Sequence, residues 1–157
     1  MSKEIFIEEQ RFNQWWLWTI LLGSMLISLY TVSQKENMTL SDYAIPGSIF
    51  LVVLLLIYSC KLKTRIDEKG IHLQFFPFHL KTVSYPWNEL YNVEVLKYSP
   101  IMDYGGWGLR ISRKGKAFNV KGDVGIKIQT ADGKTRMIGT QDGENAKQAI
   151  KSHFSKS

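Results

Sequence analysis

Hydrophobic residues follow two different patterns along the chain, one in the first 60 residues and another in the remainder. No charged side chain occurs in the 21 residues of segment 12–32 or in the 18 residues of segment 43–60. A helix of about 20 apolar residues is long enough to cross the hydrocarbon core of a bilayer. The sequence therefore predicts a membrane anchor over residues 1–63 that contains two transmembrane helices, at about 12–32 and 43–60.

Aromatic side chains cluster near the ends of both segments, where the interface between lipid and water favours them. They are Trp15, Trp16, Trp18, Tyr30, Tyr43 and Tyr58. The linker from Ser33 to Asp42 has only ten residues, so the two helices are expected to form an antiparallel hairpin. A pair of core helices in a soluble protein is the alternative, but a domain of this size is too small to surround two helices that are apolar on all sides.

Positively charged residues set the expected orientation, because Lys and Arg are retained on the cytoplasmic side of a membrane. Lys61, Lys63 and Arg65 follow the second segment directly, whereas the linker holds only Lys35. We therefore expect a multi-pass protein of the cell membrane with both termini in the cytoplasm. A cleaved signal peptide does not fit, because acidic residues precede the first segment and its apolar stretch exceeds the usual core of about 7–15 residues.

From Arg65 onwards, short stretches of alternating hydrophobic and polar residues indicate β-strands. The alternation occurs around residues 71–75, 83–85, 91–95, 109–111, 118–120, 126–128 and 137–138. Near the C-terminus the period becomes helical, with Ala146, Ala149, Ile150 and Phe154 on one face. The predicted fold class is α+β: the transmembrane hairpin precedes residues 64–157, a cytoplasmic antiparallel β-sheet or partly open barrel of about seven strands with a C-terminal helix.

Two motifs of the polar half carry a family resemblance: Ile66-Asp67-Glu68-Lys69-Gly70-Ile71 and Tyr85-Pro86-Trp87-Asn88-Glu89-Leu90-Tyr91-Asn92-Val93. Their order after two apolar segments resembles the bacterial pleckstrin-homology-like (PH-like) membrane proteins, in which a helical hairpin precedes a PH-type β domain. The glycine-rich block at residues 103–108 narrows the resemblance to an uncharacterised subset of these two-transmembrane proteins. The resemblance implies a PH-like domain and a membrane location, and it implies no established activity.

The positive charge of the chain lies in its β half. The whole chain has a net charge of +6, whereas residues 61–157 carry 17 Lys and Arg against 9 Asp and Glu. Five residues in this half are candidate contacts for anionic lipid headgroups: Arg110, Arg113, Lys114, Lys116 and Lys121. The same residues also fit the solvated tip of a hairpin. Nucleic-acid binding is another use of a basic β domain, but two membrane spans argue against it.

The block Tyr104, Gly105, Gly106, Trp107 and Gly108 has two interpretations. It is either a tight corner at which one backbone passes close to another, or an exposed surface that contacts a protein. A phosphate-binding loop is excluded, because no Lys-Ser/Thr pair follows and the block leads into a strand instead of a helix. If the block contacts a protein, the chain is a regulatory or accessory subunit of a membrane protein complex.

Residues suited to catalysis or metal binding form no convincing set in the sequence. Cys60 is the only cysteine, so neither an internal disulfide nor a thiolate cluster is possible. Neither His72 nor His79 has a carboxylate or thiol at the spacing of a metal ligand. We therefore predict a non-enzymatic integral membrane protein, without metal or cofactor, that binds anionic lipid headgroups, a membrane protein, or both. An enzyme with an active site assembled from distant residues is the remaining hypothesis.

Overall fold

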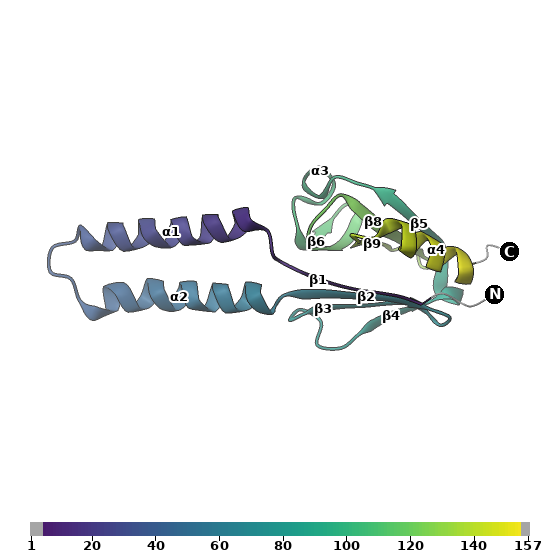
Figure 1. Ribbon diagram of the computed structural model, residues 1–157, viewed down its shortest axis with the longest axis horizontal. Coiled ribbons are helices and arrows are strands. Elements are labelled where there is room, and N and C mark those ends of the chain that lie inside the picture. The colour runs from purple at the N-terminus through teal and green to yellow at the C-terminus, as the bar shows by residue number, and fades with distance from the viewer. Residues whose placement is uncertain (1–4, 155–157) are drawn as a thin grey trace. The chain divides into compact units, whose positions relative to one another are not determined.

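The computed structural model describes residues 5–154, which divide into two compact units (Figure 1). The helical unit is Phe12–Cys60. The second unit, here called the β domain, combines the N-terminal segment up to Arg11 with the chain from Lys61 onwards. The helical unit is therefore inserted, in sequence, into the β domain.

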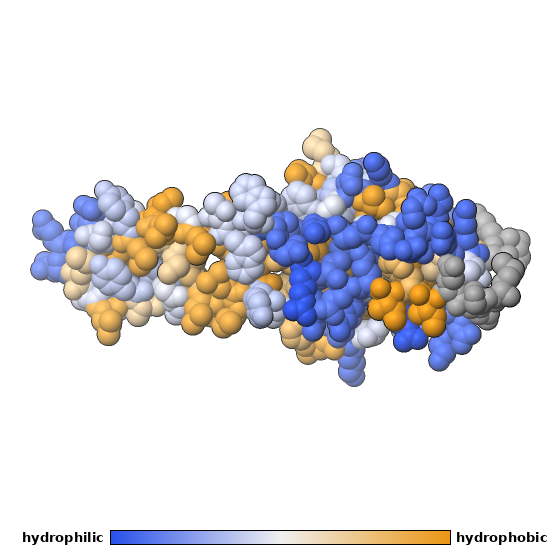
Figure 2. Space-filling model, viewed as in Figure 1, coloured by the Kyte–Doolittle hydropathy of each residue, from blue (hydrophilic) through white to orange (hydrophobic). Residues whose placement is uncertain are grey.

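The helical unit consists of two helices side by side, α1 (Trp15–Ser33) and α2 (Leu40–Ser59). Both are long and apolar enough to cross a membrane by length and composition. Val32 is the one buried residue of α1 and α2 has none, so hydrophobic residues form much of the surface of this unit (Figure 2). The helices start and end within three residues of segments 12–32 and 43–60, and the expected hairpin is present.

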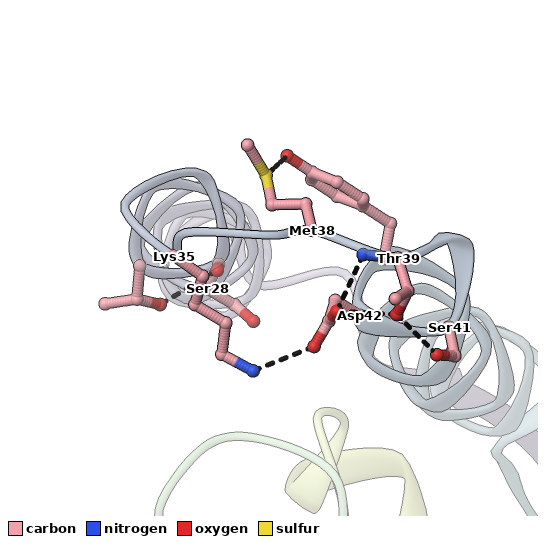
Figure 3. A network of polar contacts seen from close by, with 8 residues as sticks. Ser28, Lys35, Met38, Thr39, Ser41 and Asp42 are labelled. Carbon is pink, nitrogen blue, oxygen red and sulfur yellow. Dashed lines mark hydrogen bonds and ion pairs between the residues drawn. The ribbon is translucent and has the colours of Figure 1, made fainter.

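Polar contacts close the turn between the two helices (Figure 3). Lys35 Nζ lies 2.8 Å from Asp42 Oδ1, which joins the end of α1 to the first turn of α2. Asp42 also accepts hydrogen bonds from the Thr39 backbone N–H at 3.0 Å and the Thr39 hydroxyl at 2.7 Å. A carboxylate near a helix N-terminus satisfies donors that would otherwise lack partners. This explains why α2 begins at Leu40, three residues before the apolar segment that predicted it.

The β domain contains two sheets. The four-stranded sheet has the order β1-β2-β3-β4, with β1 Phe6–Arg11, β2 Lys61–Asp67, β3 Gly70–Phe76 and β4 Val83–Pro86. The five-stranded sheet has the order β5-β8-β9-β7-β6, with β5 Leu90–Lys97, β6 Gly108–Ser112, β7 Gly115–Asn119, β8 Val124–Thr130 and β9 Thr135–Gly139. Neighbouring strands are antiparallel except β7 and β9, which pair in parallel.

Alternation along the strands builds the core, because successive side chains point to opposite faces of a sheet. The inward residues of β2 and β3 are buried: Leu62, Thr64, Ile66, Ile71, Leu73 and Phe75. From the second sheet, Phe118, Ile126, Ile128 and Ile138 are buried as well. Each such apolar side chain contributes about 1.5–3 kcal/mol by leaving water.

Two helices complete the β domain. α4 (Gly143–His153) contacts strands of both sheets and buries Ala146, Ala149 and Ile150, as its helical period predicts. α3 (Pro100–Tyr104) is a single short turn, and its Tyr104 packs with Tyr98, Ala117 and Met137 in a second hydrophobic cluster. The α+β class and the C-terminal helix are thus as predicted.

Three features of the β domain differ from the prediction. Strand β1 lies in residues that were assigned to the membrane anchor. It was not predicted as a strand because two of its inward residues, Glu8 and Gln10, are polar and give no hydrophobic alternation. The described residues form nine strands in two sheets, one of them mixed, whereas the prediction was about seven strands in an antiparallel sheet or a partly open barrel. The 3₁₀ turn Trp87–Glu89 separates β4 from β5, which therefore belong to different sheets.

Candidate functional site

Five basic residues surround a hollow of about 400 Å³ where two turns of the five-stranded sheet meet. The β6–β7 turn and the β8–β9 turn lie together because β7 and β9 run in parallel, with Lys116 beside Arg136. Gly115 belongs to this junction: its φ is +114°, and a side chain there would collide with the Thr135 carbonyl. The basic residues that line the hollow, here called the basic hollow, are Arg113, Lys114, Lys116, Lys134 and Arg136.

Two of these five cations are already paired with carboxylates. Lys114 Nζ bonds Asp103 on α3, and this bond, with the Ser99 N–H, holds the pKa of Asp103 below its usual range. Lys134 Nζ bonds Asp132, and the pKa of that carboxyl is likewise lowered. Within residues 5–154, Arg113, Lys116 and Arg136 make no ion pair. The hollow therefore carries positive charge that its own carboxylates do not neutralise.

Arg110 and Lys121 do not join the basic hollow. The Arg110 side chain turns back along β6, and its Nε donates to the Trp107 carbonyl at 3.0 Å. Lys121 follows the opposite end of β7, where its carbonyl accepts from Gln141 Nε2 at 2.7 Å. Two residues that do line the basic hollow, Lys134 and Arg136, were not among the predicted lipid contacts. The turn at residues 131–134 was recognisable, but a parallel pairing of two strands from separate hairpins leaves no local signal.

The glycine-rich block forms a corner between α3 and β6. Gly105 ends α3 in the left-handed region, with φ of +76°, a conformation that glycine adopts without steric cost. The Gly108 N–H donates to Asn119 Oδ1 at 2.8 Å, which ties the corner to β7. Tyr104 is buried with its ring 5.9 Å from that of Tyr98. The expected contact surface is wrong for Tyr104, because its side chain supports the corner from beneath.

Exposed apolar side chains do occur beside this corner. On α3, Ile101 is 58% exposed and Met102 is 85% exposed. Trp107 is half-buried and Gly105 is exposed. A protein contact at this position would therefore involve the outer side of α3 more than the tyrosine that the sequence suggested.

A second hollow, of about 530 Å³, lies on the outer face of the four-stranded sheet. Asp67, at the end of β2, lies 3.1 Å from His72 Nε2 and 2.9 Å from Arg65 Nε. The other ring nitrogen of His72, Nδ1, lies 2.8 Å from the Ser84 hydroxyl on β4. The sequence did not reveal this chain of contacts, because it depends on the register that places His72 opposite Ser84.

The contacts around Asp67 keep its carboxyl ionised. Burial, the largest single influence, would raise the pKa of Asp67, but the Lys69 N–H, His72 and Arg65 together outweigh it and lower the pKa. The Asp67 backbone carbonyl also accepts from Trp87 Nε1 at 2.9 Å. Trp87 in turn packs against the aromatic rings of His153 and Phe154 at the end of α4. Asp67 is thus a junction between the sheet and the C-terminal helix.

The remaining titratable residues offer little chemistry. The His79 ring lies 5.3 Å from the tilted ring of Phe118, and burial together with the charge of Lys116 lowers the pKa of His79. Cys60 is a buried free thiol. In the part of the chain that the structure describes, no group of three or more His, Cys, Asp or Glu side chains could hold a metal ion.

Comparison with known proteins adds no assignment. No family model matches the chain, and no curated protein matches its sequence. Its function must therefore be inferred from the geometry of the two hollows and from the apolar helices.

Proposed function

We propose that this chain is an integral membrane protein that presents a PH-like β domain at the cytoplasmic face, where the basic hollow binds anionic lipid headgroups. The helical unit is the support for its membrane location, since α2 has no buried residue and α1 has one. The single observation that carries lipid binding is the convergence of Arg113, Lys116 and Arg136, without carboxylate partners in residues 5–154, on one concave surface.

Phosphate-bearing headgroups suit this surface chemically. The planar guanidinium group of Arg binds phosphate oxygens through two parallel hydrogen bonds, and the ammonium group of Lys adds a point charge. Near an anionic membrane each basic residue contributes roughly 1 kcal/mol of attraction. Tethering by two spans keeps the domain at the membrane surface, so even weak intrinsic affinity gives high occupancy.

The test uses the full chain in a neutral detergent, titrated with short-chain phosphatidylglycerol or with phosphatidylcholine of the same chain length. Binding is measured by calorimetry at low and high salt. A triple variant, Arg113→Gln, Lys116→Gln and Arg136→Gln, removes the unpaired charges of the hollow. The matched control removes three exposed lysines elsewhere on the β domain, by Lys97→Gln, Lys147→Gln and Lys151→Gln.

We expect the wild type to prefer phosphatidylglycerol, with affinity that falls as salt rises. The hollow variant should bind phosphatidylglycerol at least about tenfold more weakly, given roughly 1 kcal/mol per charge. The control variant has the same net charge and should keep most of the preference. If both variants lose the same affinity for phosphatidylglycerol, the effect is due to net charge and not to the hollow. If the wild type binds both lipids equally, anionic-lipid binding is refuted.

We propose a binding role in preference to a catalytic one. The Ser84, His72 and Asp67 contacts are the arrangement closest to a nucleophile with a base. However, Asp67 shares its charge with Arg65, and Trp87 and α4 hold it as a structural junction. A fluorophosphonate probe should leave the full chain unlabelled. Labelling that disappears in Ser84→Ala would instead establish a reactive serine.

An accessory subunit that docks through α3 is the second candidate, supported by the exposure of Ile101 and Met102. A photo-crosslinking residue at position 102, in the full chain in its native membrane, tests it. A single crosslinked protein whose capture is lost on Ile101→Lys would support docking. Crosslinks only to lipid would favour the membrane-surface role.

A further inference from the structure

The loop between β3 and β4, residues 77–82, presents two large apolar side chains to the outside. Phe78 is 52% exposed and Leu80 is 77% exposed. Single exposed apolar residues are ordinary on protein surfaces. The Phe78 ring lies 5.4 Å from the ring of the buried Phe75, so one side of it packs on the domain while the other side is exposed with Leu80. Two exposed apolar side chains on one short loop form a small patch that is suited to a contact.

The loop is held in place by contacts to both sheets. The His79 N–H donates to the Phe75 carbonyl at 2.7 Å, and Gln74 Nε2 donates to the Leu80 carbonyl at 3.1 Å. The His79 ring lies 5.3 Å from the ring of Phe118 in the five-stranded sheet. These contacts fix the loop backbone while about half of Phe78 and most of Leu80 remain exposed.

The register of the four-stranded sheet identifies the end at which this loop lies. Lys61, the first residue after the helical unit, pairs with Phe76, and the loop starts at the next residue. Arg11, the last residue before the helical unit, pairs with Lys61 on its other side. Adjacent strands are about 4.8 Å apart. The loop therefore extends from the end of the sheet at which the chain enters and leaves the apolar helices.

Positive charge accompanies the apolar tips. Lys61 Nζ lies 6.0 Å from the centre of the Phe76 ring, and Lys81, inside the loop, is exposed. Apolar side chains with Lys beside them suit the interface of a bilayer, where the rings and aliphatic chains reach the acyl boundary and the ammonium groups meet lipid phosphates. A protein groove would require a matching acidic rim, whereas any anionic or zwitterionic membrane offers phosphates.

We propose that Phe78 and Leu80 insert into the headgroup region of the same bilayer that α1 and α2 cross. The loop then forms a third membrane attachment of the chain, and it holds the β domain against the lipid surface. This inference rests on the proposed membrane location. It does not depend on lipid binding by the basic hollow.

The test places an environment-sensitive NBD dye on the full chain in nanodiscs. In a Cys60→Ser background, which removes the only cysteine, Leu80→Cys receives the dye. Lys69→Cys, in the β2–β3 turn at the opposite end of the same strands, is the matched control. Emission, quenching by lipids that carry a spin label near the headgroup, and quenching by iodide in water are compared in neutral and in anionic discs. Circular dichroism verifies that both labelled proteins are folded.

We expect the dye at position 80 to emit further to the blue than the dye at 69, to be quenched by the spin-labelled lipid and to be protected from iodide. Adding Phe78→Ser should reduce that protection. Equal iodide quenching at both positions would overturn the proposal, as would protection from both quenchers, which indicates a protein contact. Insertion in neutral discs, without any preference for anionic lipid, would support the loop attachment even if the calorimetric titration refutes headgroup binding by the basic hollow.

Discussion

Arg11 and Lys61 lie opposite each other in adjacent antiparallel strands, although residues 12–60 separate them in the chain. The β1–β2 pair is formed along its whole length, from Phe6 opposite Ile66 to Arg11 opposite Lys61. The β domain is thus complete only when a segment before the apolar helices joins the segment after them.

This pairing predicts that the helical unit can be replaced by a tight turn. Two-residue turns of Asn-Gly connect directly opposed residues of antiparallel strands. A variant in which Asn-Gly replaces residues 12–60 should therefore be soluble and should unfold cooperatively on heating, as followed by circular dichroism.

The matched comparison is the fragment 64–157, which lacks β1 and the buried Leu62. We expect this fragment to be insoluble or unfolded, because removing an edge strand and a core residue exposes the inner face of β2 and β3. If fragment 64–157 proves as stable as the variant in which Asn-Gly replaces residues 12–60, β1 contributes nothing to the stability of the fold.

Glu8 links β1 to the region between β9 and α4. Its carboxylate accepts from the Thr140 hydroxyl at 2.6 Å and from the Gln141 N–H at 2.7 Å. Hydrogen bonds to a charged group contribute about 1.5–3 kcal/mol. Glu8→Ala should lower the free energy of unfolding of the β domain by about 1–3 kcal/mol. The measurement is thermal unfolding of the full chain in detergent.

Glu9 is the control for this prediction, because it lies next in the chain but points outward to Arg11 and Lys63. Surface ion pairs of this kind contribute about 0–1 kcal/mol. A Glu9→Ala variant that is destabilised as much as Glu8→Ala would show that the effect belongs to the strand and not to the carboxylate.

Tyr98 and Asn119 form a buried polar pair, in which Asn119 Nδ2 donates to the Tyr98 hydroxyl at 2.9 Å. Burial raises the pKa of Tyr98 to about 12, so the phenol stays neutral in ordinary buffers. Tyr98→Phe removes the hydroxyl that accepts this hydrogen bond and leaves the buried Asn119 amide without its acceptor. The free energy of unfolding should fall by about 1–3 kcal/mol. Chemical denaturation of the full chain measures this loss. Tyr91→Phe, at a side chain that is 68% exposed, should change stability by less than about 0.5 kcal/mol.

Asp67 predicts a specific acid sensitivity. Its pKa is lowered in the folded state, so its stabilising effect is present above the unfolded value of about 3.9 and is lost as the pH falls through the lower, folded value. The stability difference between the wild type and Asp67→Asn should therefore be constant from pH 7 to about pH 5 and should shrink below about pH 4. Chemical denaturation of the wild type and of Asp67→Asn at each pH in this range measures the stability difference. A difference that persists unchanged at about pH 3 would contradict an ionised Asp67.

The strongest local signals in the sequence predicted the structure well. Uncharged runs identified both apolar helices, because a stretch of about 20 residues without charge is rare outside membrane-spanning helices. The spacing of Ala146, Ala149 and Ile150 predicted α4, and the alternation around Ile71 and Phe75 predicted β3. The glycine-rich block was recognised as a candidate corner, but the expected reason was close approach of a second backbone, and a side chain at Gly105 or Gly108 would meet nothing nearby. The structure instead explains these glycines by their positive φ angles, which glycine adopts easily.

The features that escaped prediction all depend on pairing between distant segments. β1 places the polar residues Glu8 and Gln10 inward, and their hydrogen bonds to the β9–α4 region replace the hydrophobic alternation that marks an ordinary strand. The basic hollow needs the parallel pairing of Lys116 with Arg136, and the His72 contacts need the register of β3 on β4. A sequence shows which segments favour a β-strand, but it does not show which other strand each of them pairs with.

The pairing of β1 with β2 also has a consequence for how the protein is made. β1 leaves the ribosome first and has no partner until both apolar helices and β2 have been synthesised. If only one helix crossed the bilayer, the two strands would be left on opposite sides of it and the four-stranded sheet could not form. On the proposed membrane location, completion of the sheet therefore reports that both ends of the helical unit lie on the same side of the bilayer. A chain with only one helix inserted would expose an unpaired edge to the proteases that remove misassembled proteins.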